Sequence, residues 1–137
     1  MIVADTGAVV ALIDADDRHH EVLRALFEAD PQQWVLPWAV LPEVDDLVQT
    51  HVGAEAQETF LAGLDAGVFS VEWGQETDLS RARALCARYR ALKLGLVDAA
   101  VMAIAERLQA RAVATLDVRD FGAVALQGKP LLFPRDL

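Results

Sequence analysis

Short apolar runs alternate along this chain with longer stretches in which hydrophobic residues recur at helical spacing. The short runs predict strands at residues 2–5, 34–36, 68–71, 112–116 and 130–133. Each is brief, and turn-forming residues such as Pro37 and Gly67 bound some of them, as is typical of buried strands.

The intervening stretches predict six helices. One example is the stretch before Asp30-Pro31, where His20, Leu23, Leu26 and Phe27 share one helical face. The predicted helices cover residues 8–13, about 20–30, 41–48, 55–66, about 76–92 and 98–109. Strands that alternate with helices predict right-handed βαβ units. We therefore expect one α/β domain over residues 1–137, with a mostly parallel sheet of about five strands between two helical layers.

Composition narrows the class of protein. Hydrophobic residues make up 54% of the chain, which is enough for a packed core, yet no long uncharged run predicts a membrane span. Asp5 interrupts the N-terminal apolar run, which disfavours a signal peptide. The single cysteine, Cys86, excludes an internal disulfide and a cysteine-based zinc cluster. We expect a cytoplasmic protein with no membrane contact.

The net charge of −9 is unusual for a protein that acts on nucleic acid, because phosphates attract cations. The distribution of charge is more informative. Residues 79–97 contain no acid but five cations, Arg81, Arg83, Arg88, Arg90 and Lys93. This segment is either a solvated helix face or a phosphate-binding edge that contacts RNA, and charge alone does not decide between them.

Two acids follow predicted strands. Asp5 ends the first strand and Asp117 comes just after the fourth, at the sheet edge where function gathers in open parallel α/β sheets. If these strands are neighbours, the two carboxylates lie side by side and repel unless a cation neutralises them. Because no cysteine or histidine pair accompanies them, this grouping points to a hard divalent metal, Mg²⁺ or Mn²⁺.

Two further acids lie at predicted helix starts, where both would face the same sheet edge. Glu43 falls in a first helical turn, so it also suits the helix dipole. Asp98 opens its predicted helix, so it also suits an N-cap. Asp120 either adds to the acids or caps the short turn before Phe121, and we favour the structural role.

Four segments together resemble the PIN domain, and more narrowly the VapC toxins of bacterial toxin–antitoxin pairs. The segments are Val3-Ala4-Asp5-Thr6-Gly7, Leu41-Pro42-Glu43, Val97-Asp98-Ala99-Ala100 and Ala114-Thr115-Leu116-Asp117-Val118-Arg119-Asp120-Phe121. The most specific piece is Thr-Leu-Asp-x-x-Asp-Phe, downstream of an Asp-opened, alanine-rich helix. The resemblance extends over essentially the whole chain.

This resemblance implies a PIN-like three-layer α/β/α fold and hydrolysis of RNA phosphodiesters by a metal-activated water. It implies that Asp5, Glu43, Asp98 and Asp117 are the catalytic, metal-binding acids, supported by the hydroxyls of Thr6 and Thr115. It also implies a homodimer and a cognate antitoxin whose C-terminal segment covers the acids. The helices beginning near Leu41 and Glu55 are candidates for the antitoxin groove.

Other signals are weaker. His19-His20-Glu21 lacks the second histidine of a zinc motif, because position 24 is Arg. Trp34, Trp38 and Trp73 could stack on bases, but tryptophans in such a domain are more often core or interface residues. Two alternatives to a nuclease remain, a non-catalytic PIN-fold binding module and a phosphoryl-transfer or receiver-like domain. Lys129 disfavours the latter, because it precedes the last strand instead of following it.

Overall fold

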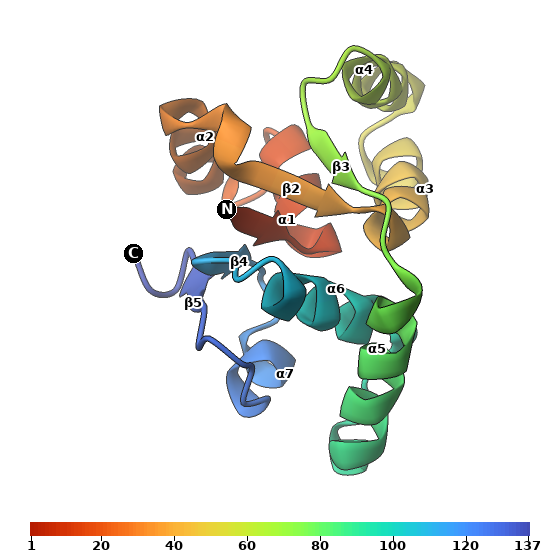
Figure 1. Ribbon diagram of the computed structural model, residues 1–137. Coiled ribbons are helices and arrows are strands. Elements are labelled where there is room, and N and C mark those ends of the chain that lie inside the picture. Colours follow the sequence, from red (N-terminus) through yellow and green to blue (C-terminus); the bar gives the residue numbers. More distant parts are fainter.

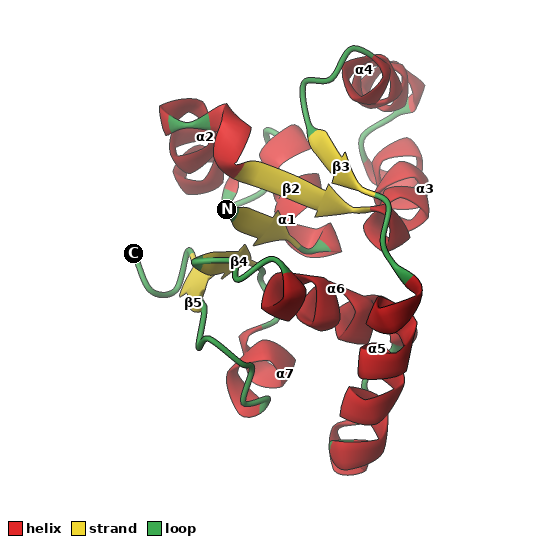
Figure 2. Cartoon of the chain, in the orientation of Figure 1, coloured by secondary structure: helices red, strands yellow, loops and turns green.

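A five-stranded sheet, in which every pairing is parallel, runs through the centre of the computed structural model, which describes all residues 1–137 (Figure 2). The strand order across the sheet is β3-β2-β1-β4-β5. The strands are β1 (Ile2–Ala4), β2 (Trp34–Pro37), β3 (Ser70–Glu72), β4 (Ala112–Ala114) and β5 (Leu131–Phe133). The prediction of a mostly parallel sheet of about five strands is confirmed.

Seven helices connect and cover the strands. They are α1 (Thr6–Ile13), α2 (His20–Ala29), α3 (Leu41–His51), α4 (Ala54–Asp65), α5 (Glu76–Arg88), α6 (Leu96–Arg107) and α7 (Val118–Ala123). Helices α1 to α4 gather on one side of the sheet, and α5 to α7 on the other (Figure 1). The predicted three layers are therefore present. None of these helices combines the length and apolar character needed to cross a bilayer.

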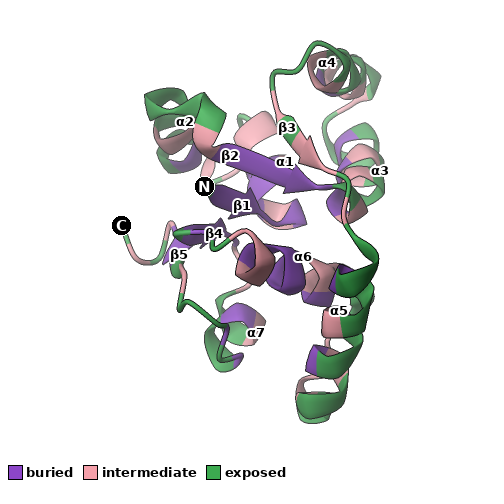
Figure 3. Ribbon diagram, viewed as in Figure 1, coloured by how far each residue is buried: buried purple, intermediate pink, exposed green.

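The core lies where the central strands meet the helices. Every residue of β1, β2 and β4 is buried, and Figure 3 shows these strands as the most enclosed part of the sheet. Strands covered on both faces are expected to be apolar throughout instead of alternating. Trp34 is fully buried at the start of β2, and its ring meets Phe27 of α2 edge to face at 5.6 Å.

Several element boundaries differ from the predicted ones by a few residues. The third strand is shifted to Ser70–Glu72, because its partner β2 sets the pairing Val35↔Ser70. Helix α5 stops at Arg88, because Tyr89 leaves the helical conformation. Helix α6 begins at Leu96 with Gly95 as its N-cap, two residues before the expected start. The six-residue helix α7 was not predicted.

The strand order sets the position of the functional edge. The chain builds outward from β1 through β2 to β3, then returns to place β4 on the other side of β1. Ligands bind at such a reversal in open parallel sheets, outside the carboxyl ends of the strands. Here those ends are followed by Asp5 on β1 and by Thr115 on β4. The first and fourth strands are thus neighbours, as the proximity of Asp5 and Asp117 required.

Candidate active site

Asp5 is the most deeply buried acid of the sheet edge, with 5% of its surface exposed. Its Oδ2 accepts a hydrogen bond of 3.0 Å from Thr115 Oγ1, while its Oδ1 is buried without any partner. Burial raises the pKa of this carboxyl above its usual value, and the nearby Asp117 and Glu43 raise it further. Hydrogen bonds from Thr6 and Thr115 oppose that rise. Asp5 is therefore a carboxylate held where it lacks a counter-charge.

Asp117 follows β4 and is fixed from both sides. Its backbone N–H donates to Thr115 Oγ1 at 3.0 Å. Its Oδ1 accepts from the backbone N–H of Asp120 at 3.0 Å, so its side chain caps α7. The hydroxyl of Thr115 thus connects two of the predicted site acids, Asp5 and Asp117, across adjacent strands.

Asp98 lies inside the first turn of α6. Gly95 is the N-cap of that helix, so the N-cap explanation for Asp98 is wrong. Burial raises its pKa to about 7, with further contributions from four acids, Asp5, Asp117, Asp120 and Glu43. A carboxyl with such a pKa marks a place where negative charges converge with nothing to neutralise them.

Glu43 belongs to the first turn of α3, as predicted, and it is the most accessible of the predicted acids. Its Oε1 accepts a hydrogen bond of 2.7 Å from Thr6 Oγ1, the first residue of α1. Because Thr6 directly follows Asp5, this bond ties α3 to the end of β1. Both predicted supporting hydroxyls, those of Thr6 and Thr115, therefore contact a predicted site acid.

For Asp120 the sequence left two roles open and favoured capping over membership of the acids, and the structure favours the second. The side chain that caps α7 is that of Asp117, and Asp120 supplies only the backbone N–H. Asp120 Oδ1 is buried with no hydrogen-bond partner. One carboxylate oxygen each from Asp98, Asp117 and Asp120 lie within 4.8 Å of one another. Asp120 therefore belongs to the acid cluster, which we define as Asp5, Glu43, Asp98, Asp117 and Asp120.

The acid cluster fits a hard divalent cation. Its donors are all carboxylate oxygens, which Mg²⁺ and Mn²⁺ prefer, and three of them converge within the space of one ion. The unpartnered buried oxygens of Asp5 and Asp120 have unused acceptor capacity. No lysine or arginine forms an ion pair with Asp5, Glu43, Asp98 or Asp117, and the one contact to Asp120, from Arg119, is 3.9 Å long.

The five cations of residues 79–97 differ in the contacts that they make within the fold. Arg81 is bound in two hydrogen bonds of 2.6 and 3.1 Å to the carboxylate of Glu106 in α6. Arg88 lies over the ring of Tyr89, 5.6 Å from its centroid. The remaining three, Arg83, Arg90 and Lys93, line one cavity. Arg81 is therefore occupied within the fold, whereas those three form no ion pair.

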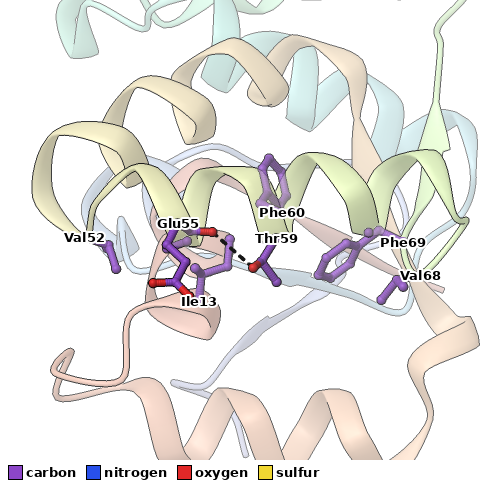
Figure 4. A pocket seen from close by; sticks show the side chains of 9 residues that line it. Ile13, Val52, Glu55, Thr59, Phe60, Val68 and Phe69 are labelled. Atoms are coloured by element: carbon purple, nitrogen blue, oxygen red, sulfur yellow. Dashed lines mark hydrogen bonds between the residues drawn. The ribbon is translucent and has the colours of Figure 1, made fainter.

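The largest cavity lies away from the acid cluster. It encloses about 650 Å³ between α4, the end of α1 and the segment before β3, with Phe60 and Phe69 among its walls (Figure 4). No residue of the acid cluster lines it. Helix α4, which begins near Glu55 and was one of the two candidates for the antitoxin groove, forms one wall of this cavity. Trp34 is a core residue, whereas Trp38 and Trp73 are exposed and line a smaller cavity beside α5 and α6.

Comparison with known proteins agrees with this architecture. The chain is 28% identical over 123 residues to Ribonuclease VapC26 of Mycobacterium tuberculosis, a match that covers 90% of this chain and 91% of the relative. Its fold resembles that of VapC20, a sarcin–ricin loop cleaving toxin of M. tuberculosis, with a TM-score of 0.81 at 23% identity over 93% of this chain and 98% of the other.

A chain of a toxin–antitoxin complex from Klebsiella pneumoniae has the same fold, with a TM-score of 0.68 at 22% identity, over 90% of this chain and 92% of that one. FitAcB from Neisseria gonorrhoeae matches with a TM-score of 0.65 at 16% identity, over 97% and 96% of the two chains. The sequence pattern of the PIN domain matches residues 2–126. Since that match covers nearly the whole chain, the protein belongs to the PIN domain family.

Proposed function

We propose that this protein is the toxin of a type II toxin–antitoxin pair, a metal-dependent endoribonuclease that hydrolyses RNA phosphodiesters. The observation that carries the proposal is the acid cluster, five carboxylates at one sheet edge of which three converge within 4.8 Å. The similarity to Ribonuclease VapC26 over most of both chains supports RNA as the substrate.

The residues of the acid cluster have different proposed roles, according to their positions. Asp98, Asp117 and Asp120 would hold Mg²⁺ or Mn²⁺, with Asp5 and Glu43 completing the negative site. A cation bound there would supply an activated water and neutralise charge on the phosphate. Thr115 orients Asp5 and holds the backbone of Asp117, while Thr6 orients Glu43. Attack by water implies a product with a 5′-phosphate.

A bound cation also explains how a protein with a net negative charge can act on RNA, which is itself negatively charged. Without a cation, the acid cluster repels phosphate, and burial together with the four other acids raises the pKa of Asp98 to about 7. With a cation, the site presents positive charge to the substrate. The proposal therefore makes activity depend strictly on Mg²⁺ or Mn²⁺.

The similarity to toxins of toxin–antitoxin pairs also suggests how the proposed activity is regulated. We propose that a cognate antitoxin covers the acid cluster, that the toxin forms a homodimer, and that both act in the cytoplasm. The resemblance to the chain from a toxin–antitoxin complex supports the first of these ideas.

The main alternative is a PIN-fold module that binds without catalysis. It would have no reason to keep three carboxylates within 4.8 Å of one another, and it predicts no Mn²⁺ binding in calorimetric titration. A receiver-like domain is disfavoured, since β5 begins after Lys129 and the last strand carries no lysine at its carboxyl end.

The direct experiment incubates purified, antitoxin-free protein with total RNA and sequences the cleaved ends. We expect cleavage with Mg²⁺ or Mn²⁺, none with EDTA, and none from Asp5→Asn or Asp98→Asn. Asp46→Asn removes an exposed acid of α3 outside the cluster and is the matched control. If the wild-type protein cleaves no RNA with either metal, the proposed activity is wrong.

A further inference from the structure

A cavity of about 520 Å³ lies at the C-terminal end of α5, and three cations line it. Arg83 lies within α5, while Arg90 and Lys93 belong to the connection that follows it. The remaining lining residues, Cys86, Ala87 and Leu94, carry no charge. The Sγ of Cys86 lies 3.7 Å from the Leu94 carbonyl oxygen, so the connection is held against α5. We call this the basic cavity.

None of the three cations of the basic cavity has an acidic partner. The ion pairs of the structure involve Arg24, Arg81, Arg107, Arg119 and Arg135 only. The chain has 21 acids against 12 lysines and arginines, yet residues 79–97 contain no acid at all. Three like charges around one space repel one another, and an anion placed among them relieves that repulsion.

The helix dipole does not account for this arrangement. Cations near a helix C-terminus are favourable, but the effect fades beyond the last turn. Arg88, the last residue of α5, satisfies that preference. Arg83 lies five residues earlier, and Lys93 follows a separate 3₁₀ turn at Arg90–Leu92, so neither is explained. The position of the three charges around a common cavity needs another reason.

The basic cavity is close to the acid cluster along the chain. Lys93 precedes Asp98 by five residues, so their Cα atoms are at most ~18 Å apart even if the chain were extended. Leu94, a wall of the cavity, leads through Gly95 directly into α6, whose first turn contains Asp98. A flexible polyanion that contacts the cavity therefore reaches the acid cluster within a few repeat units.

We propose that the basic cavity binds backbone phosphate of the RNA strand, a few nucleotides from the bond that is cut. This rests on the proposed ribonuclease function and adds a second contact point to it. The acid cluster, with its cation, engages the scissile phosphate, whereas Arg83, Arg90 and Lys93 hold a flanking phosphate without any metal. Such a contact is independent of base sequence, because it is made to the backbone.

The test measures binding of a fluorescently labelled 12-nucleotide single-stranded RNA of mixed sequence, by anisotropy in EDTA, over 50–200 mM salt. The triple variant Arg83→Gln, Arg90→Gln, Lys93→Gln keeps side-chain bulk but removes the charges. Loss of three phosphate contacts should lower the slope of log affinity against log salt by ~2. Over this salt range, the wild-type protein should therefore lose about 20-fold more affinity than the variant.

The control variant is Arg18→Gln, Arg24→Gln, Lys129→Gln, which gives the same net charge from cations outside the cavity. Its salt slope should stay within ~0.5 of the wild-type slope, and circular dichroism should show both variants folded. The proposal is overturned if the salt slope drops equally for both variants, or if it drops for neither of them. Normal RNA binding by the cavity variant, combined with loss of binding to an acidic peptide, assigns the cavity to a protein partner and also overturns it.

Failure of the proposed ribonuclease function can be distinguished from failure of the proposed phosphate site. The binding assay contains no metal, so a protein that cleaves no RNA can still show the predicted slope difference. Conversely, metal-dependent cleavage of RNA, with the same salt slope for the cavity variant and the wild type, would support the nuclease function and contradict the phosphate site.

Discussion

The hydroxyl of Thr115 donates a 3.0 Å hydrogen bond to Asp5, a residue 110 positions earlier in the chain. The same oxygen accepts the backbone N–H of Asp117. One buried hydroxyl therefore fixes the relative positions of two carboxylates that would otherwise repel each other. The contact exists because β1 and β4 are neighbours in the sheet, with Ala4 opposite Ala114.

Thr115→Val should test this link, because valine keeps the shape and removes the hydroxyl. Asp5 would then be buried with neither oxygen bonded to a side chain, at a cost of about 1–3 kcal/mol in the free energy of unfolding. Urea denaturation measures the change. Thr115→Ser, which keeps the donor, should recover most of the loss, and equal destabilisation by both substitutions would contradict the role of the hydroxyl.

Asp98 should make the metal-free protein less stable as pH rises. Its pKa is about 7 in the folded protein, against 3.8 for the ordinary carboxyl. Between these values the folded state holds a proton that the unfolded state has released, so the free energy of unfolding falls from about pH 4 to about pH 7. In EDTA, Asp98→Asn should therefore match wild type in melting temperature at pH 4 and exceed it at pH 8. Parallel pH profiles for the two proteins would contradict this, and Asp46→Asn is the control.

Asp120→Asn should weaken Mn²⁺ binding about tenfold or more, since it removes one negative charge from a group of three converging carboxylates. The backbone N–H of residue 120 still reaches Asp117, so α7 keeps its cap. Isothermal titration calorimetry gives the dissociation constant. Asp16→Asn, an exposed acid in the turn before α2, should leave it unchanged. An unaltered constant for Asp120→Asn would remove this residue from the cluster.

Arg107, at the end of α6, holds a second group of acids together. It donates two hydrogen bonds of 2.7 and 3.0 Å to Asp78 and one of 2.7 Å to Glu72. Arg107→Met should cost about 2–3 kcal/mol, because the buried Asp78 carboxylate loses its counter-charge. Arg107→Lys should not restore it fully, since a single ammonium cannot match the forked contact. A urea midpoint for Arg107→Met within error of wild type would show that the network contributes little.

Much of the fold could be predicted because burial leaves a direct record in the sequence. The strands 2–4, 34–37 and 112–114 are covered on both faces, so they are apolar without interruption. The third strand was predicted two residues too early because β3 lies at the edge of the sheet. Its residues are exposed or only partly buried, so they are not uniformly apolar. Val68, placed in that strand from its hydrophobicity, is exposed in the turn that follows α4.

The proximity of Asp5, Glu43, Asp98 and Asp117 could be predicted, whereas the convergence of Asp120 with them and the pairing of Arg81 could not. Helix α7 has six residues, too few for a periodic pattern, so nothing local indicated whether Asp117 or Asp120 would cap it. Arg81 is neutralised by Glu106, 25 residues further along. Such a contact depends on how α5 packs against α6, which no local spacing reveals.

The position of β1 in the middle of the sheet has a consequence for synthesis on the ribosome. The residues of the acid cluster extend from Asp5 to Asp120, and β4 must insert beside β1 before Asp117 can lie next to Asp5. A nascent chain that has emerged only as far as α6 therefore lacks two of the three carboxylates that converge, Asp117 and Asp120. If the protein is a nuclease, it stays harmless through most of its own translation.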